Sequence, residues 1–228
     1  MYQCSRRKML GLVGGIVAGG AIAGLAGPAW AATTGTKSGA TALYPKTFKS
    51  LMAAVAFEVQ ANANYLAFAD AADKDGHREI AAIFRAIAAA ELKHANDEFA
   101  IAQSLISSAV KPKAEKAALA GSTAANLQAA IAGETEEYTK IYPGFVKIAQ
   151  AERMRTALGI FTIAKLAEEV HAGIYADLLK HIDKFDREKY AKVYRCPVCG
   201  NIVPTVRPMA CPICGDEGED LIEYTIVG

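Results

Sequence analysis

The chain has 228 residues, 52% of them hydrophobic, and a formal net charge of +1 at pH 7. This length and apolar content suit one medium-sized core together with a small second unit that needs additional stabilisation. The nearly neutral charge excludes the strong basic field of a nucleic-acid-binding protein, so no nucleic-acid partner is expected.

The first 31 residues have the organisation of a signal peptide. A basic run at residues 6–8 precedes an apolar stretch at residues 9–26, and Ala29-Trp30-Ala31 matches the small-residue pattern of a cleavage site. The paired arginines and the Gly-rich apolar stretch resemble a twin-arginine (Tat) export signal more than a Sec signal. We therefore expect cleavage after Ala31 and a periplasmic mature protein, whose net charge falls to −2 because three basic residues are removed. An uncleaved N-terminal membrane anchor is the alternative.

One of the five cysteines, Cys4, stands alone near the start of the chain. It precedes the apolar stretch of the signal peptide, so it is not placed as a lipid-acceptor cysteine. It also lies in the segment that we expect to be removed. We therefore assign no role to Cys4 and expect the metal ligands among the other four cysteines.

Four amphipathic helices are expected after a Gly-, Ser- and Thr-rich tether at residues 32–44. Apolar residues recur at helical spacing in four segments of similar length, and the connection at residues 107–121 is long enough to cross a bundle. Pro143 should kink the third helix. The pattern predicts a mainly α four-helix bundle over residues 45–186, with helices at about residues 45–73, 77–106, 123–152 and 153–182.

Carboxylates and imidazoles recur within the apolar faces of these helices. The second and fourth helices each carry Glu-x-x-His, and at three residues apart these side chains share a face. Glu91 follows Glu58 by 33 residues and Glu168 follows Glu134 by 34, so a two-fold-like bundle brings four carboxylates to one level. This is the arrangement of di-iron carboxylate proteins. The residues are Glu58, Glu91, His94, Glu134, Glu168 and His171.

The composition of this predicted site favours a pair of redox metals. One Glu-x-x-His pair could arise by chance on a solvated face, but ionised carboxylates within apolar stripes are costly unless a cation compensates them. Oxygen and imidazole ligands without a thiolate suit iron or manganese. Glu137, three residues after Glu134, adds a fifth carboxylate, whereas the corresponding position in the first helix is Ala61. With these ligands, two Fe(II) and an oxo-bridged pair of Fe(III) carry the same net charge, which favours two-electron cycling.

The other four cysteines form two knuckles, Cys196-x-x-Cys199 and Cys211-x-x-Cys214, with 11 residues between them. Two such close pairs indicate metal ligands before disulfides. Tetrahedral coordination by four sulfurs suits zinc or a single iron, and the spacing does not distinguish the two metals. Residues 191–228 are too few to be stable by burial alone, so we expect them to fold around this metal as short strands and turns.

These motifs resemble those of the rubrerythrin family. Residues 132–143 are similar to the family's third-helix signature, and Glu91-x-x-His94 and Glu168-x-x-His171 are similar to its two Glu-x-x-His motifs. The cysteine knuckles resemble its rubredoxin-like domain, although the loop between them is a little shorter than in the commonest form. The resemblance covers nearly all of residues 46–228. It implies a ferritin-like bundle followed by a rubredoxin-like domain.

The resemblance also implies roles for individual residues. One iron would move toward His94 on reduction and leave Glu137, so these two residues are the candidate catalytic residues. Tyr65 and Tyr142 match the family's tyrosines that hydrogen-bond to ligand carboxylates. The implied ligands of an oxo- and carboxylate-bridged di-iron centre are Glu58, Glu91, His94, Glu134, Glu137, Glu168 and His171, and those of a further iron, or zinc, are Cys196, Cys199, Cys211 and Cys214.

On this resemblance we expect an oxidoreductase of oxidative-stress defence. Its reaction would be the reduction of hydrogen peroxide to water at the di-iron centre of a homodimer. A separate redox protein would donate electrons, which would pass through the Fe(Cys)4 centre. The alternatives from other functional classes are a ferritin-like ferroxidase or iron-storage protein and a structural adaptor built from a zinc site and a bundle.

Overall fold

The computed structural model describes residues 44–106, 108–109 and 111–226. The predicted signal peptide at residues 1–31, which includes Cys4, lies outside these ranges, and so does the predicted tether apart from Tyr44. Both segments therefore remain predictions. Within the described ranges, no helix has both the length and the apolar composition that crossing a membrane requires.

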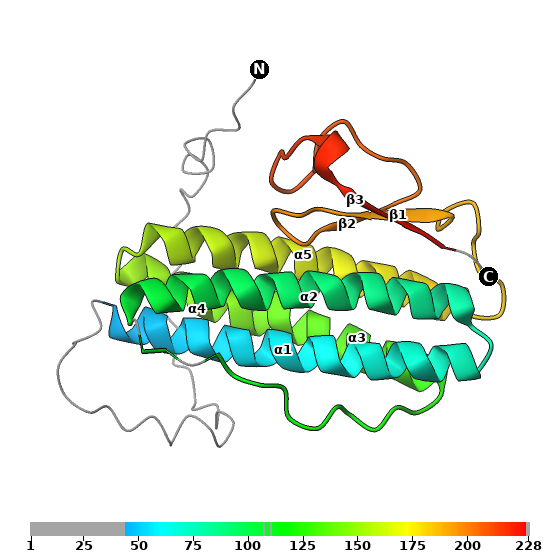
Figure 1. Cartoon of the computed structure of the whole chain (residues 1–228), viewed down its shortest axis with the longest axis horizontal. Helices are drawn as coiled ribbons and strands as arrows, with labels where there is room; N and C mark the ends of the chain where they lie inside the picture. Colours follow the sequence, from blue (N-terminus) through cyan, green and yellow to red (C-terminus); the bar gives the residue numbers. More distant parts are fainter. Residues whose placement is uncertain (1–43, 107, 110, 227–228) are drawn as a thin grey trace. The chain divides into compact units, whose positions relative to one another are not determined.

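Long helices make up most of the described chain (Figure 1). They are α1 (Pro45–Lys74), α2 (Arg78–Leu105), α3 (Thr123–Glu136), α4 (Tyr142–Ala151) and α5 (Arg155–Lys180). Pro45 stands in the first turn of α1, where no helical hydrogen bond needs its missing N–H. Gly76, at φ +88°, allows the tight reversal between α1 and α2. Ser122 caps α3 by accepting a hydrogen bond from the N–H of Ala125.

A π-helical segment, η3 (Glu137–Ile141), joins α3 to α4. The N–H of Tyr142 donates to the carbonyl of Glu137, five residues earlier, whereas an α-helix would use the fourth. Pro143 follows in the first turn of α4 and has no N–H to donate. The single kinked helix expected at residues 123–152 is therefore two α-helices with a wider turn between them.

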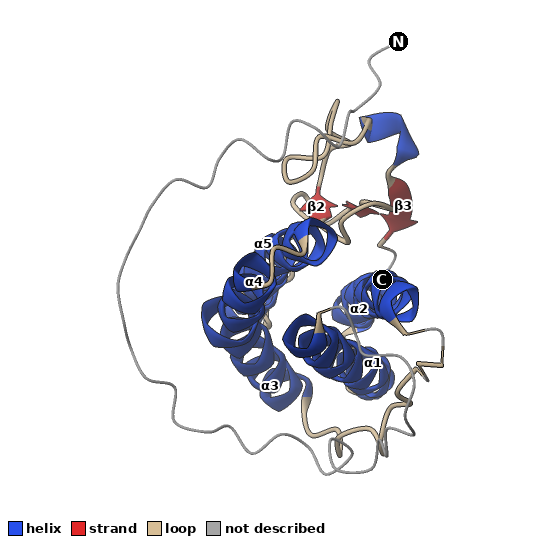
Figure 2. Cartoon of the chain, turned by 90° about the vertical axis from the view of Figure 1, so that its left-hand side faces the viewer, coloured by secondary structure: helices blue, strands red, loops and turns tan. Residues whose placement is uncertain are grey.

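The helices form a four-helix bundle in two layers (Figure 2). α1 packs against α2, while α5 packs against α3 and α4, which together take the place of one helix. The connection between α2 and α3 runs along the bundle, so these two helices point in the same direction (Figure 1). Gln60 and Asn64 of α1 hold this connection by accepting from the N–H groups of Glu115 and Ala118, each at 2.8 Å. The predicted mainly α four-helix bundle is confirmed.

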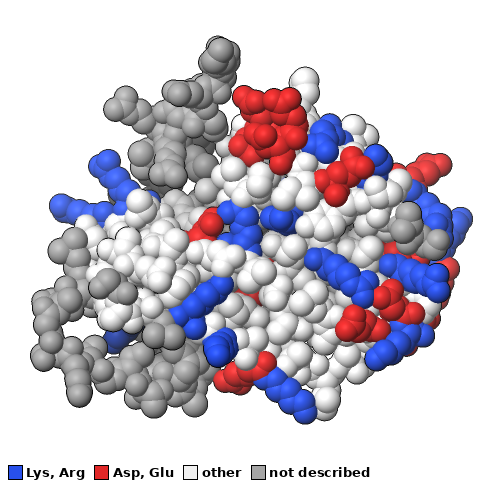
Figure 3. Space-filling view, viewed as in Figure 1, with Lys and Arg blue, Asp and Glu red and all other residues white. Residues whose placement is uncertain are grey.

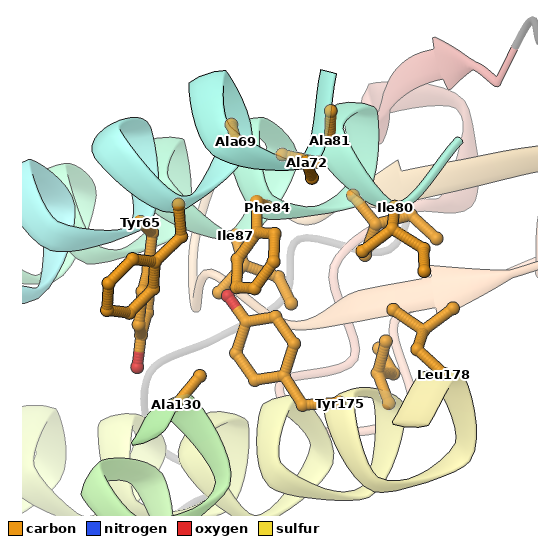
Figure 4. Close-up of a cluster of buried hydrophobic side chains, with 14 of the residues drawn as sticks. Tyr65, Ala69, Ala72, Ile80, Ala81, Phe84, Ile87, Ala130, Tyr175 and Leu178 are labelled. Atoms are coloured by element: carbon orange, nitrogen blue, oxygen red, sulfur yellow. The ribbon is translucent and has the colours of Figure 1, made fainter. Parts of the chain in front are cut away.

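An aromatic cluster joins the two layers of the bundle. The ring centroid of Phe84 lies 6.1 Å from that of Tyr65, 5.8 Å from that of Phe68 and 5.0 Å from that of Tyr175. Figure 4 shows Tyr65 and Phe84 projecting toward Tyr175, which comes from the facing helix α5. Each of these rings is almost fully removed from solvent, so the cluster stabilises the contact between layers chiefly by hydrophobic burial.

The C-terminal segment forms a small antiparallel sheet. Its strands are β1 (Lys192–Arg195), β2 (Ile202–Pro204) and β3 (Ile222–Thr225), in the order β2-β1-β3, and a short 3-10 helix, η4 (Gly218–Asp220), precedes β3. The segment's own core consists mainly of the four cysteines with Tyr194 and Leu221. Val193, Ile202 and Ile226 instead join the core of the bundle. The sheet therefore depends on the helices for part of its burial, as its small size requires.

Truncation of the central aromatic ring tests this packing. Phe84→Ala should destabilise the metal-loaded protein by about 3–5 kcal/mol, because it removes a fully buried ring and leaves a cavity. The measurement is the urea dependence of the helical circular dichroism. Leu66→Ala, at a side chain that is 44% exposed on α1, should change stability by less than about 0.5 kcal/mol and serves as the control. Equal effects of the two variants would contradict the assignment of Phe84 to the inter-layer core.

Candidate metal centres

Two sets of four side chains converge inside the bundle, and in each set the potential ligand atoms lie within 4.8 Å of one another. The sets share Glu91 from α2 and Glu168 from α5. Carboxylates common to both sets are placed to bridge two metal ions. All of these residues are buried. The first set is Glu58, Glu91, His94 and Glu168, and the second is Glu91, Glu134, Glu168 and His171.

Both imidazoles present Nδ1 to the carboxylates and Nε2 to a backbone carbonyl. His94 Nε2 lies 3.0 Å from the carbonyl oxygen of Cys199, and His171 Nε2 lies 3.3 Å from that of Gly200. Because a carbonyl only accepts hydrogen bonds, Nε2 is the protonated nitrogen in both rings. The Nδ1 atoms lie 2.9 Å and 2.8 Å from the two oxygens of Glu168. Each Nδ1 is therefore the atom that binds a cation or carries a second proton.

The buried carboxyl oxygens test whether metal ions fit this site. One oxygen in each of Glu58, Glu91, Glu134 and Glu168 makes no hydrogen bond within the described chain. Such an oxygen is costly to bury, and the described residues include no Lys or Arg that forms an ion pair with these four carboxylates. Two cations held by these oxygens and by the imidazole nitrogens would satisfy all four oxygens. The residues therefore fit a di-iron centre.

The pKa shifts in the cluster reflect its crowded negative charge. Burial, followed by the charge of Glu168, raises the pKa of Glu58 to about 8. Burial opposes ionisation of Glu168 as well, but His94 and His171 outweigh it and lower the pKa of Glu168 to about 2. Burial disfavours protonated His94, yet Glu168, together with Glu58 and Glu91, more than offsets this and raises the pKa of His94 well above its usual range. Metal binding must displace the Nδ1 protons of His94 and His171, so metal affinity should fall as the pH falls.

Two tyrosines hold one carboxylate in each set. Tyr65 Oη donates to Glu134 Oε1 at 2.7 Å, and Tyr142 Oη donates to Glu58 Oε1. These are the two tyrosines that the family resemblance places beside the ligands. Each hydrogen bond fixes the orientation of its carboxylate and spreads its negative charge.

Glu137 belongs to neither set. It is half-buried at the start of η3, and burial, followed by the charge of Glu58, raises its pKa well above the usual range. The charge of Glu137 is therefore coupled to the charges of the cluster. The N–H of Glu137 still bonds to the carbonyl of Gly133 as in an α-helix, so the wider turn changes the side-chain directions of the residues after Glu137. Its role as a ligand remains a prediction.

Two buried polar residues beside the site were not predicted. Glu98 is fully buried and follows Glu91 by seven residues and His94 by four, so the spacing on one helical face was a usable signal. Tyr175 follows His171 by four residues, and its buried hydroxyl makes no hydrogen bond within the described chain. Both residues therefore continue the helical faces that carry the ligands.

The four cysteines of the C-terminal segment form the second centre. Cys196 Sγ lies 3.5 Å from Cys214 Sγ, and Cys199 Sγ lies 3.4 Å from Cys211 Sγ. These separations are much longer than a disulfide bond of about 2.05 Å. They are close to the roughly 3.8 Å edge of a tetrahedron whose sulfurs lie about 2.3 Å from a metal. Contacts among the sulfurs lower the pKa of Cys211 and raise that of Cys199, because adjacent thiolates need a cation to ionise together.

The fifth cysteine, Cys4, is not one of the four residues of this centre. It lies outside the described residues. The two knuckles supply the four sulfurs that a tetrahedral metal requires, and the site needs no ligand from the N-terminal segment.

The first knuckle lies directly on the di-iron cluster, where the carbonyls of Cys199 and Gly200 meet the two imidazoles. Gly200 has φ +74°, and a Cβ at this position would lie 2.3 Å from His94 Nε2. Gly215, the corresponding residue of the second knuckle, has φ +76° and no atom within 4 Å of the same position. Only the first knuckle therefore needs glycine for close approach as well as for backbone conformation.

The rubrerythrin family model matches residues 49–179, which is more than half of the chain. The chain belongs to the rubrerythrin family. It is 40% identical over 172 residues to nigerythrin of Nitratidesulfovibrio vulgaris, covering 74% of this chain and 81% of that protein. It is 35% identical over 175 residues to rubrerythrin of Porphyromonas gingivalis, covering 74% and 85%. The family assignment made from the motifs is confirmed.

Solved structures agree with this assignment. Nigerythrin in its fully reduced, all-ferrous state superposes with a TM-score of 0.74 at 37% identity, covering 85% of this chain and 91% of that one. Reduced symerythrin from Cyanophora paradoxa gives a TM-score of 0.51 at 20% identity and shows a shared fold only. The relatives and the residue clusters together support a di-iron site and a rubredoxin-like four-cysteine site. As a member of this family, the chain is a di-iron oxidoreductase of oxidative-stress defence.

Removal of a shared carboxylate tests the di-iron assignment. Glu168→Ala should lose both bundle irons but keep the metal at the cysteines, because Glu168 belongs to both sets and the cysteines lie in another segment. Metal analysis combined with the visible spectrum measures the two centres separately. Glu169→Ala, at the adjacent exposed residue of α5, should keep its full iron content and serves as the control. A full di-iron complement in Glu168→Ala would contradict the assignment.

Proposed function

We propose that this chain reduces hydrogen peroxide to water at its di-iron centre and receives electrons through an iron bound by the four cysteines. The observation that carries the proposal is the contact between the centres. The peptide carbonyl of Cys199 lies 3.0 Å from His94, and the next carbonyl lies 3.3 Å from His171. A redox metal at the cysteines would therefore be linked to His94 through the backbone of its ligand Cys199, and to His171 through the next residue, Gly200.

The number of electrons that peroxide reduction requires suits a di-iron centre supplied by a single-iron centre. Reduction of one hydrogen peroxide to two waters consumes two electrons and two protons, and the iron pair, when bound, supplies both electrons by passing from Fe(II) to Fe(III). Cys196, Cys199, Cys211 and Cys214 would hold a single iron, which would supply one electron at a time. Zinc has no redox chemistry and would leave the contact without an electron-transfer role. We therefore propose iron in the four-cysteine site.

The residues of the bundle would bind and orient rather than react covalently. The shared carboxylates Glu91 and Glu168 hold the two ligand sets at a fixed separation, and Tyr65 and Tyr142 keep Glu134 and Glu58 in place. Burial of the cluster limits the access of water and of larger oxidants.

Ligand exchange between Glu137 and His94 is part of the proposal. His94 belongs to the first set, while Glu137 belongs to neither set but is electrostatically coupled to Glu58 and Glu134. Both residues could therefore serve the same metal in different oxidation states, with the imidazole favoured by Fe(II) and the carboxylate by Fe(III).

The electron donor would be a redox protein that binds the C-terminal segment. We also propose that the chain is exported to the periplasm, as its twin-arginine-like N-terminus indicates, where a soluble nicotinamide cofactor is an unsuitable direct donor. Figure 3 shows basic and acidic side chains interspersed on one face, with one acidic group near its upper edge. The segment contains the acidic residues Asp216, Glu217, Glu219 and Asp220, which favour a donor with a basic surface.

Loss of the thiolate centre tests the proposed function. Cys211→Ser should abolish ferric-thiolate absorption and leave the first knuckle in contact with the imidazoles, because Cys211 belongs to the second knuckle. The reduced variant should still consume one peroxide per iron pair in stopped-flow experiments. Its steady-state peroxide reduction with a protein donor should fall roughly 100-fold, equivalent to about 2.7 kcal/mol.

Metal analysis should give near three irons per wild-type chain, and a much higher ratio would indicate iron storage instead.

A matched pair of glycine variants tests the electron route. Gly200→Ala introduces a methyl group against His94, whereas Gly215→Ala adds the same backbone strain at an open position. We expect re-reduction of the di-iron centre from the reduced thiolate centre to slow by roughly tenfold or more in Gly200→Ala only, because small displacements of positioned groups carry large rate costs. Both variants should retain the ferric-thiolate spectrum. Equal rates in the two variants would mean that electrons enter by another path.

A further inference from the structure

Glu98 lies beside the di-iron ligands without belonging to either set. It is 0% exposed, and its Oε2 makes no hydrogen bond within the described chain. Its Oε1 lies 2.9 Å from Tyr142 Oη, and the same hydroxyl is hydrogen-bonded to Oε1 of Glu58. One hydroxyl therefore stands between two buried carboxyl groups.

The number of protons in this chain of contacts is limited. A tyrosine hydroxyl has one proton, so Tyr142 can donate to Glu58 or to Glu98 but not to both. If both carboxyls were ionised, one of the two contacts would join lone pairs and would be repulsive. Two favourable contacts require a second proton, carried by one of the carboxyl groups.

The surroundings assign that proton to Glu98. Glu58 belongs to a ligand set, in which a carboxylate oxygen must be free of a proton to bind a cation. Glu98 belongs to no set, and within the described residues no Lys or Arg forms an ion pair with it. Burial, followed by the charge of Glu58, raises the pKa of Glu98 well above its usual range. The groups that act on its charge are Glu58, His94, Tyr142 and Glu168.

We propose that Glu98 is a positioning residue, a neutral carboxylic acid that donates a hydrogen bond to Tyr142 Oη. Because this hydroxyl then accepts from Glu98, its own proton is donated to Glu58. The order of donation runs from Glu98 through Tyr142 to Glu58. Without Glu98, the hydroxyl would be free to turn away from the ligand carboxylate. The protonated acid also holds a proton two hydrogen bonds from a ligand set, where the proposed peroxide reduction consumes protons. Only this last consequence rests on the proposed function.

The proton itself can be observed. The diferric protein at pH 7, in which Glu137 would be an iron ligand, should show an infrared C=O band of a protonated carboxyl group that shifts in heavy water. Glu98→Gln should abolish this band while the helical circular dichroism stays unchanged. Absence of the band from wild type, or its survival in Glu98→Gln, would overturn the proposal, because the proton would then lie elsewhere. This measurement requires no peroxide turnover, so its failure is distinct from failure of the proposed function.

The positioning effect is measured by iron affinity. Glu98→Gln keeps an N–H that can donate to Tyr142, so iron affinity should stay within about twofold of wild type. Glu98→Leu and Tyr142→Phe each remove the directed donor to Glu58 and should weaken iron binding by roughly tenfold, the lower end for loss of a ligand's hydrogen-bond partner. Equal weakening in Glu98→Gln and Glu98→Leu would show that the charge of Glu98 matters and would overturn the proposal. If Glu98→Leu does not fold, Tyr142→Phe and the infrared comparison decide.

Discussion

The burial of a cluster of acidic groups that form no ion pair with Lys or Arg within the described chain is the constraint on which the rest of the structure depends. Four carboxylates and two imidazoles that form the two ligand sets lie inside the bundle, and Glu98 adds another acid beside them. Within the described chain their ion-pair partners are histidines alone. Ionised groups at this depth are stable only with compensating charge, so metal binding and folding of the bundle are energetically linked.

The architecture follows from placing these groups at one level. Glu-x-x-His pairs on α2 and α5 each put two ligand atoms on one helical face, while α1 and α3 contribute single carboxylates. The long crossing connection lets α2 and α3 run in the same direction (Figure 1). The π-helical segment η3 begins three residues after Glu134. The aromatic cluster around Phe84 then holds the two layers in register beside the site. The first cysteine knuckle contributes the backbone carbonyls that select the tautomers of both histidines.

The fold was predictable because its signals are local. Helical spacing of apolar residues, Glu-x-x-His motifs and cysteine knuckles are all contained within short segments, and they indicated the bundle, the metal classes and the family. The contact between His94 and Cys199 was not predictable, because it joins residues 105 positions apart and has no local pattern. The π turn was also missed, since Pro143 indicated only that the helix would be disturbed. Glu98 was overlooked because an acid on a helix ordinarily faces solvent.

The two requirements at Gly200 limit how freely the parts of this protein could be exchanged during evolution. A rubredoxin-like segment that folds independently needs a residue tolerant of positive φ after its first knuckle, a requirement that asparagine can also meet. Here any side chain would meet His94, so the bundle imposes its own selection on a residue of the other segment. A segment taken from a free-standing electron carrier would bind its metal yet fail to seat on these helices unless it also had glycine there. Exchange of either metal segment would therefore require a matching surface on the other.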